Sequence, residues 1–189
     1  MSIPATIERS VIRGRAVTDV LLVIGASAII AIAAQIAIPI PFTPVPLTMQ
    51  PLAVVMVGIV LGARRGAAAA TLYLLEGISG LPVFAQGHGG ALWLLGPTAG
   101  YLYSYPLAAF VAGWFSQRGW GSSILRALAG MLIAMAIIYA GGWSWLAILS
   151  GPRAAFTMGI VPFVIADIVK VAIGAALLPY VERWMARLS

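Results

Sequence analysis

Asp167 and Lys170 stand three residues apart in the stretch PFVIADIVK, inside one of the most apolar regions of the chain. Residues at this spacing share a helix face, so the two side chains point the same way. Pro162 suits the start of a helix, because its fixed φ and missing N–H cost nothing there. At about 1.5 Å per residue, Asp167 then lies one to two turns into that helix.

Three interpretations of this pair remain open. The pair can be structural, although a buried ion pair often fails to recover its desolvation cost. Asp167 can be a proton relay in a secondary transporter, but it would have to exchange protons beside a cation. The pair can also bind a ligand. Aspartate only accepts hydrogen bonds and lysine only donates them, which fits an N–H beside a C=O, as in a cyclic urea, a lactam or a pyrimidine.

The composition indicates a membrane protein. Of 189 residues, 62% are hydrophobic and 8% are charged, whereas a soluble domain carries about 25% charged residues. The chain has no cysteine and one histidine, which argues against thiolate chemistry and transition-metal sites. The arginines are scattered, so the net charge of +6 does not indicate a nucleic-acid partner. No cleavable signal peptide is evident. We expect one domain over residues 1–189, with no catalytic residue, metal or cofactor.

Six apolar segments predict an all-α integral membrane protein, a bundle of six transmembrane helices in the lipid bilayer. They are residues 17–38, 47–61, 67–75, 97–115, 124–149 and 163–181. With six crossings, the arginines of the N-terminal arm (1–16), of the 64–65 turn, of the 118–126 connection and of the C-terminal tail fall on one side. The opposite connections contain only Arg153. The positive-inside rule then makes both termini cytoplasmic.

Two connections on the outer side are rich in helix-breaking residues. Residues 39–51 include five prolines, and residues 76–97 include six glycines. Irregular backbone at membrane depth survives only when it is buried in protein or lines a wet cavity. We therefore expect these Pro/Gly-rich outer loops to cover a ligand site, with simple surface loops as the alternative.

Three stretches resemble the signature regions of BioY proteins, the biotin-binding S components of energy-coupling-factor (ECF) transporters. They are IPIPFTPVPLTMQPLAV, GLPVFAQGHGGALWLLGPTAGYL and PFVIADIVK, and the resemblance covers nearly the whole chain. It implies biotin uptake across a bacterial cytoplasmic membrane, either with a transmembrane T component and an ATPase pair or alone. The alternatives are an S component for a different vitamin and a proton-coupled secondary transporter. The chain departs from the family pattern at Ala99, Ile165 and Ala166.

The resemblance also implies which residues bind biotin. The ureido ring would meet Asp167 and Lys170, the apolar parts would meet aromatic walls, glycines would permit close backbone approach, and amides and a hydroxyl would add hydrogen bonds. The expected substrate-binding residues are Asp167, Lys170, Gln86, Gly89, Gly90, Phe84, Trp93, Tyr101, Thr48 and Gln50. For the biotin carboxylate, the candidates are Arg153 and His88.

Coupling to an energy source needs a partner or an ion gradient, because the chain lacks the G-x-x-x-x-G-K-[ST] phosphate loop. Small residues on the first helix would allow a partner helix to approach closely, or equally would pack against the chain's own helices. The expected docking residues are Gly25, Ser27, Ala28, Ala31 and Ala34. A second row of small residues, Gly58, Gly62 and Gly66, predicts internal packing.

Overall fold

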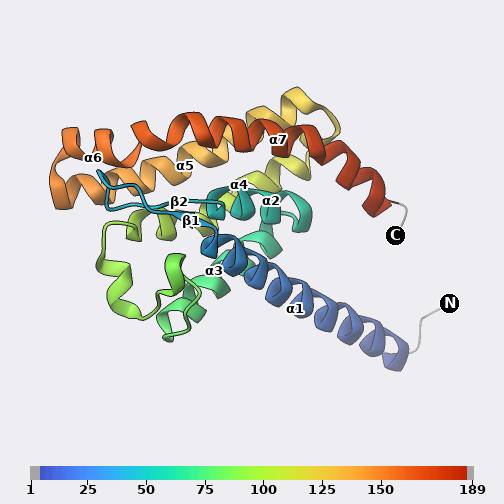
Figure 1. Ribbon diagram of the computed structural model, residues 1–189. Coiled ribbons are helices and arrows are strands. Elements are labelled where there is room, and N and C mark those ends of the chain that lie inside the picture. The colour runs from blue at the N-terminus through green and yellow to red at the C-terminus, as the bar shows by residue number, and fades with distance from the viewer. Residues whose placement is uncertain (1–4, 187–189) are drawn as a thin grey trace.

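The computed structural model describes residues 5–186, with the side chains of residues 16–178 and of Tyr180. It consists of α-helices joined by short connections (Figure 1). The elements in chain order are α1 (Ala5–Gln35), β1 (Ala37–Ile38), β2 (Leu47–Thr48), α2 (Gln50–Leu61), α3 (Ala63–Ile78), η1 (Ala85–Gly87), η2 (Ala91–Leu95), α4 (Ala99–Ser116), η3 (Trp120–Ser122), α5 (Ile124–Ser150), α6 (Pro152–Gly159) and α7 (Val161–Ala186).

Each of the six apolar segments lies largely in one helix, namely α1, α2, α3, α4, α5 or α7. The first helix differs from the expectation, because α1 already begins at Ala5 and takes in most of the expected arm (1–16). The side chains of the arginines in that arm and in the C-terminal tail lie outside the described residues. The first turns of α1 and the last turns of α7 lie towards the same side, opposite α6 (Figure 1).

Helix α6 is an element that the sequence did not predict. Gly151 has φ 84° and ends α5, and Pro152 at the first position of α6 suits a helix start. Arg153 therefore lies on a short helix and not on a plain loop. Pro162 is the second residue of α7, as expected for a proline at a helix start.

A sharp turn joins α2 to α3. Gly62 alone separates the two helices, and its φ of 81° is a left-handed conformation that favours glycine. The turn is packed against α4, because a Cβ added to Gly113 would collide with the backbone of Gly62 and Ala63.

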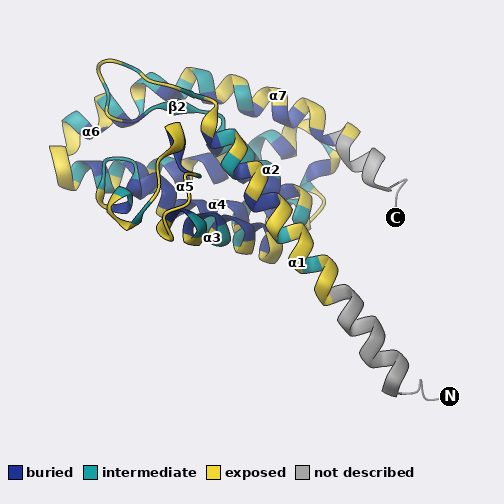
Figure 2. Cartoon of the chain, turned by 60° about the horizontal axis from the view of Figure 1, so that its bottom comes forward, coloured by how far each residue is buried: buried dark blue, intermediate teal, exposed yellow. Residues whose placement is uncertain are grey.

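Helix α4 is the central helix of the bundle. It packs against α2, α3 and α5, and Figure 2 shows mostly buried residues along it. A Cβ at Gly58 would collide with the backbone of Ala109 on α4, and one at Gly66 would lie 2.6 Å from Cα of Gly58. The prediction that Gly58, Gly62 and Gly66 pack internally is confirmed. Small residues at such crossings are the usual means of close helix packing in membranes.

The outward surface of the bundle is strongly apolar. Leu21, Ile32 and Ile165 are 64%, 66% and 78% exposed. Three helical stretches are long and apolar enough to cross a membrane: residues 16–35 of α1, the whole of α5, and residues 161–178 of α7. Exposed apolar surface of this extent marks contact with another phase or partner, and for helices of this length the phase is a bilayer.

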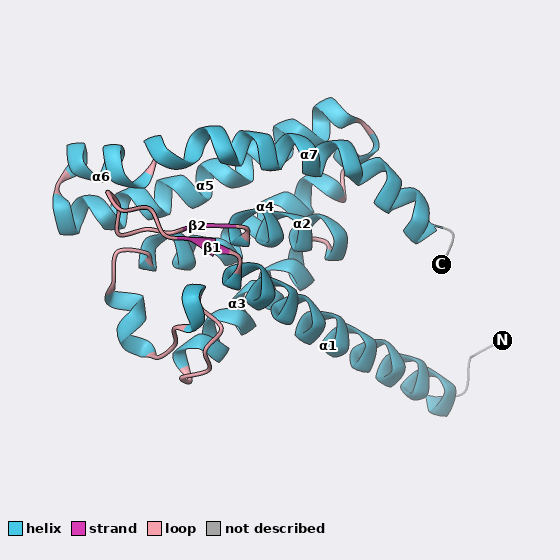
Figure 3. Ribbon diagram, in the orientation of Figure 1, coloured by secondary structure: helices cyan, strands magenta, loops and turns pink. Residues whose placement is uncertain are grey.

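The two Pro/Gly-rich connections are only partly irregular (Figure 3). Strands β1 and β2 pair antiparallel, with Ala37 opposite Thr48, and enclose the proline-rich residues 39–46. The Thr43 hydroxyl donates to the carbonyl of Met158 on α6 over 2.7 Å. The second connection contains the 3-10 turns η1 and η2. Short hydrogen-bonded elements thus satisfy backbone groups that long structureless loops would leave unpaired.

Candidate functional site

A hollow lies among α2, α4, α5 and α7 and is lined also by both Pro/Gly-rich connections. It has about 590 Å³ of space free of protein atoms, part of it open to solvent. Most of its wall is apolar or aromatic, and its few polar side chains come from different elements. The polar ones are Thr48, Gln50, Thr98, Tyr101, Tyr105, Tyr139 and Asp167. An apolar wall with a few converging polar groups is typical of small-molecule sites.

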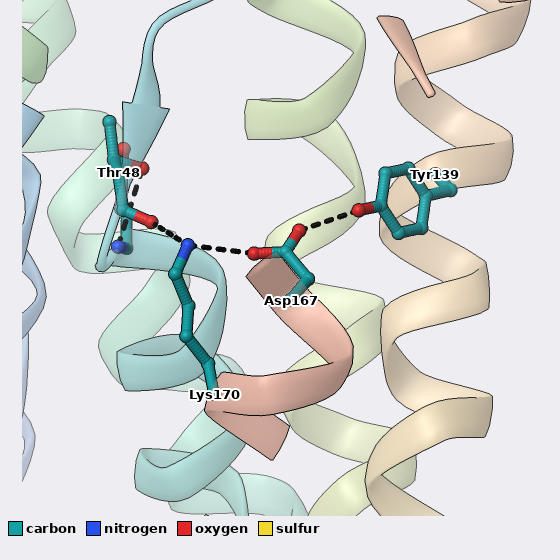
Figure 4. Close-up of polar contacts among 5 residues, drawn as sticks. Thr48, Tyr139, Asp167 and Lys170 are labelled. Carbon is teal, nitrogen blue, oxygen red and sulfur yellow. Dashed lines mark hydrogen bonds and ion pairs between the residues drawn. The ribbon is translucent and has the colours of Figure 1, made fainter. Parts of the chain in front are cut away.

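Asp167 is the charged side chain in this wall, and two partners hold it (Figure 4). The Lys170 ammonium donates to Oδ1 over 2.7 Å, and the Tyr139 hydroxyl donates to Oδ2 over 2.6 Å. The same ammonium donates to the Thr48 carbonyl over 2.8 Å. Asp167 is only 6% exposed. These contacts fix the carboxylate rigidly at the edge of the hollow.

The network leaves hydrogen-bonding capacity for a ligand. A carboxylate has about four lone-pair positions and an ammonium three N–H donors. The protein uses one position on each oxygen of Asp167 and two donors of Lys170. About two acceptor positions and one donor remain. This combination suits a group that presents N–H donors beside a carbonyl, such as a cyclic urea.

Lys170 contacts Asp167 but is not part of the wall of the hollow. Its side chain is 14% exposed, and the residues lining the hollow include Asp167 but not Lys170. The sequence thus predicts the pair correctly as an ion pair, and the structure adds that Lys170 also bridges α7 to the end of β2. Direct contact between Lys170 and a ligand stays a prediction.

Tyr139 is a functional residue that the sequence reasoning missed. It lies on α5, 28 residues before Asp167, and donates to the carboxylate oxygen that Lys170 does not use. The available signal was weak: one hydroxyl-bearing aromatic residue in the apolar stretch MAIIYAGGW. Nothing local in the sequence connects that residue to Asp167, because the contact runs between two helices.

The three expected aromatic residues all line the hollow. The Phe84 ring is fully buried and meets Tyr73 edge-to-face at 5.6 Å between centroids. The Tyr101 hydroxyl donates to the carbonyl of Gly159 over 2.6 Å, so its proton is not available to a ligand. Trp93 is stacked by His88 at 3.9 Å. These rings provide flat apolar walls.

The expected residues Gln86, Gly89 and Gly90 do not line the hollow. Gln86 is exposed with φ 61°. A Cβ at Gly89 would collide with the carbonyl of Leu81, and Gly90 has φ 94° and donates its N–H to Gly77 over 2.7 Å. The two glycines are thus required by the loop's own backbone, and their contact with a ligand stays a prediction.

Two amides attach the glycine-rich connection to the helices. Gln35, at the end of α1, donates to the carbonyls of Val83 and Phe84 and accepts from the N–H of Gly87 over 2.9 Å. Gln50 lines the hollow and donates to the Tyr73 hydroxyl over 2.6 Å. That hydroxyl in turn donates to Val83. The sequence reasoning missed Gln35 and assigned Gln50 only to the ligand.

The two carboxylate candidates lie outside the hollow. Arg153 is exposed on α6, and His88 is exposed against Trp93, with its Nδ1 2.8 Å from the carbonyl of Ala85. None of the described lining residues is a cation. A role for either residue in holding a carboxylate stays a prediction. Among the described side chains there is also no cluster of three His, Cys, Asp or Glu that could hold a metal.

The small residues of α1 do not share one face. Ser27 and Ala34 are fully buried inside the chain's own bundle, and the Ser27 hydroxyl donates to the carboxylate of Glu76 on α3. Gly25 and Ala28 are exposed and Ala31 is half-buried. Internal packing therefore explains Ser27 and Ala34, while a docking surface on the exposed members stays a prediction.

Comparisons with known proteins agree on one family. A family model described as the BioY family matches residues 6–187. A biotin transporter BioY from Rhizobium etli is 38% identical over 168 residues, covering 84% of this chain and 89% of the relative. One from Thermotoga maritima is 41% identical over 139 residues, covering 73% and 81%. A crystal structure of the S-component for biotin from an ECF-type ABC transporter superposes with TM-score 0.81 at 25% identity, covering 90% of this chain and 93% of that one.

Proposed function

The chain belongs to the BioY family, and from that premise we propose that it binds biotin in the hollow beside Asp167 and mediates biotin uptake as an S component. It is a transport protein and not an enzyme, and biotin is its cargo and not a cofactor. The observation that carries the proposal is the buried Asp167 carboxylate, which faces an apolar hollow with a cation beside it.

The remaining hydrogen-bonding capacity matches the head of biotin. The ureido ring presents two N–H donors and one carbonyl, and the Asp167–Lys170 pair has about two acceptor positions and one donor left. Phe84, Trp93 and Tyr101 would enclose the apolar remainder of the molecule. The protein would therefore recognise the ring by its polar edge and the rest by shape.

The topology proposed for this function is a single domain of six crossings, α1 to α5 and α7, with both termini in the cytoplasm. The first turns of α1 and the last turns of α7 lie towards the same side (Figure 1), which supports this arrangement, as does the excess of arginine in the segments expected on that side. The membrane would be the bacterial cytoplasmic membrane. For energy the chain would associate with a T component and an ATPase pair, because it carries no phosphate loop of its own.

Biotin binding to the purified chain in detergent is the direct test. We expect isothermal titration to give a dissociation constant below about 1 µM, or −8.2 kcal/mol. Desthiobiotin, which keeps the ureido ring, should also bind, whereas thiamine should not. If the folded chain does not bind biotin, the assignment to biotin is wrong. If it binds thiamine as tightly as biotin, the site does not select its ligand by the ureido ring.

A further inference from the structure

One hydroxyl in the wall of the hollow has no partner. Thr98 Oγ1 is buried, and among the buried side-chain nitrogen and oxygen atoms that the structure describes it is the one without a hydrogen bond. Buried polar groups in native proteins are nearly always paired, so each exception needs an explanation. Thr98 belongs to the lining of the same hollow as Asp167.

Thr98 lies at the N-terminal end of α4, where a hydroxyl usually has a hydrogen-bond partner. Thr98 is the N-cap residue of α4, where a threonine hydroxyl ordinarily accepts from a backbone N–H of the first turn. Here it makes no such bond, and the N–H of Tyr101 donates to the Thr98 carbonyl over 3.1 Å instead. The Thr98 hydroxyl therefore does not cap α4, although it lies at the N-cap position.

Two other hydroxyls on this wall already donate to acceptors within the protein. Tyr101 donates to Gly159, and Tyr139 donates to Asp167. We propose that Thr98 Oγ1 donates a hydrogen bond to an oxygen of the bound substrate, and so complements Asp167, which accepts from the substrate's N–H groups. The inference rests on the proposed function, and it makes Thr98 a specificity-determining residue at a second point of the substrate.

Thr98→Val tests this directly, because valine keeps the branched shape and replaces the hydroxyl with a methyl group. We expect it to weaken biotin binding about tenfold (about 1.4 kcal/mol). Without ligand, its melting temperature in detergent should stay unchanged or rise, because an unpaired buried polar group is removed. Thr98→Ser, which keeps the hydroxyl, should bind within a few-fold of the parent.

Two outcomes would overturn the role of Thr98. One is parent-like biotin binding by Thr98→Val. The other is a drop in the ligand-free melting temperature of Thr98→Val, which would mean that the hydroxyl supports the fold. Failure of the proposed function is a separate result, because it appears as absent biotin binding by the parent protein in the same titration.

A second, independent observation lies at the turn between α2 and α3. A hollow there, with about 1040 Å³ of space free of protein atoms and partly open to solvent, is lined by residues of α1, α2, α3 and α4 and by Gln117 just after α4. Arg64 and Arg65 form its basic side, and Phe110 and Trp114 on α4 are among its apolar lining residues, 40% and 38% exposed. It therefore combines cationic and aromatic surface.

The charges around this hollow are unbalanced. Arg65 pairs with Asp19 at 2.5 Å, both about half exposed. Arg64 is exposed and has no acidic partner among the described residues. Arg118 lies 3.4 Å above the Trp114 ring. Around the hollow there are thus three guanidinium groups (Arg64, Arg65 and Arg118) and one carboxylate (Asp19), which leaves an excess of positive charge.

We propose that this hollow binds the headgroup of an anionic phospholipid. Guanidinium groups bind phosphate oxygens in pairs of parallel hydrogen bonds, and basic pockets between membrane helices are known to hold anionic headgroups. The half-exposed Trp114 fits the level of the lipid headgroups. The excess positive charge favours an anionic lipid over a zwitterionic one.

Native mass spectrometry of the detergent-solubilised chain with equal amounts of dioleoyl phosphatidylglycerol and dioleoyl phosphatidylcholine tests this proposal. We expect the parent to retain phosphatidylglycerol at least fivefold over phosphatidylcholine. Arg64→Gln with Arg65→Gln should abolish the preference without changing biotin binding. The control, Arg126→Gln with Arg153→Gln, has the same net charge and should keep the preference.

Several results would contradict the lipid site. Equal retention of both lipids by the parent would show no selectivity. If the test and control variants lose the same amount of lipid preference, the preference depends only on the net charge of the chain and not on this hollow. A parent that binds inorganic phosphate but not phosphatidylglycerol would carry a soluble-anion site. A test variant that keeps its lipid preference but no longer co-purifies with an ECF module would mark the hollow as a protein-docking surface.

Discussion

Asp167→Asn is expected to weaken biotin binding at least a hundredfold, or about 2.8 kcal/mol. The substitution removes the charge to which Lys170 donates over 2.7 Å and to which Tyr139 donates over 2.6 Å. Breaking one side of a buried ion pair costs about 3–5 kcal/mol, because the other charge is left uncompensated. Stability and binding should therefore both fall, which isothermal titration and thermal unfolding in detergent will measure.

The double variant Asp167→Asn with Lys170→Met separates recognition from structure. It removes both charges, and such neutral replacements of buried pairs are often tolerated. We expect it to recover much of the stability lost in the single variant and still to bind biotin poorly. Parent-like biotin binding by the double variant would reduce the pair to a structural role. Tyr139→Phe, which removes one hydrogen bond to the carboxylate, should have an intermediate effect.

Gly58→Val is expected to abolish the folded bundle. A Cβ at Gly58 would collide with the backbone of Ala109, and a Cβ at Gly66 on α3 would lie 2.6 Å from Cα of Gly58. Three helices thus meet where no side chain fits, and backbone atoms cannot move aside as a flexible side chain can. Overpacking typically costs about 1–3 kcal/mol and occasionally more, and we expect this site to reach or exceed the upper value.

The matched control for this change is Gly25→Val on α1, where nothing lies within 4 Å of an added Cβ. Size-exclusion profiles and melting temperatures in detergent should show Gly25→Val close to the parent and Gly58→Val aggregated or strongly destabilised. Similar behaviour of the two variants would mean that the close approach of α2, α3 and α4 does not limit stability. Gly25→Val also tests docking, because Gly25 is one of the exposed small residues of α1.

The sequence predicts much of the scaffold, because that information is local. A content of 62% hydrophobic residues is itself the evidence for a membrane class. Apolar length gives the helical segments, and Arg64 and Arg65 mark the turn between the second and third of them. The spacing of Asp167 and Lys170 predicts their contact, because i and i+3 side chains meet on any helix. The sequence did not predict α6, because eight residues of mixed polarity resemble a loop.

By itself, then, the sequence determined the membrane class, the helical segments and the ion pair of this protein, since each depends on neighbours along the chain. Only the tertiary structure decided which groups complete the site. Tyr139 reaches Asp167 across 28 residues, Lys170 reaches Thr48 across 122, and Gln35 reaches Phe84 across 49. It also decided that Ser27 faces inward and that the Thr98 hydroxyl is unpaired. Such facts depend on how helices rotate against one another, and helix packing fixes that rotation through side-chain contacts that no local pattern encodes.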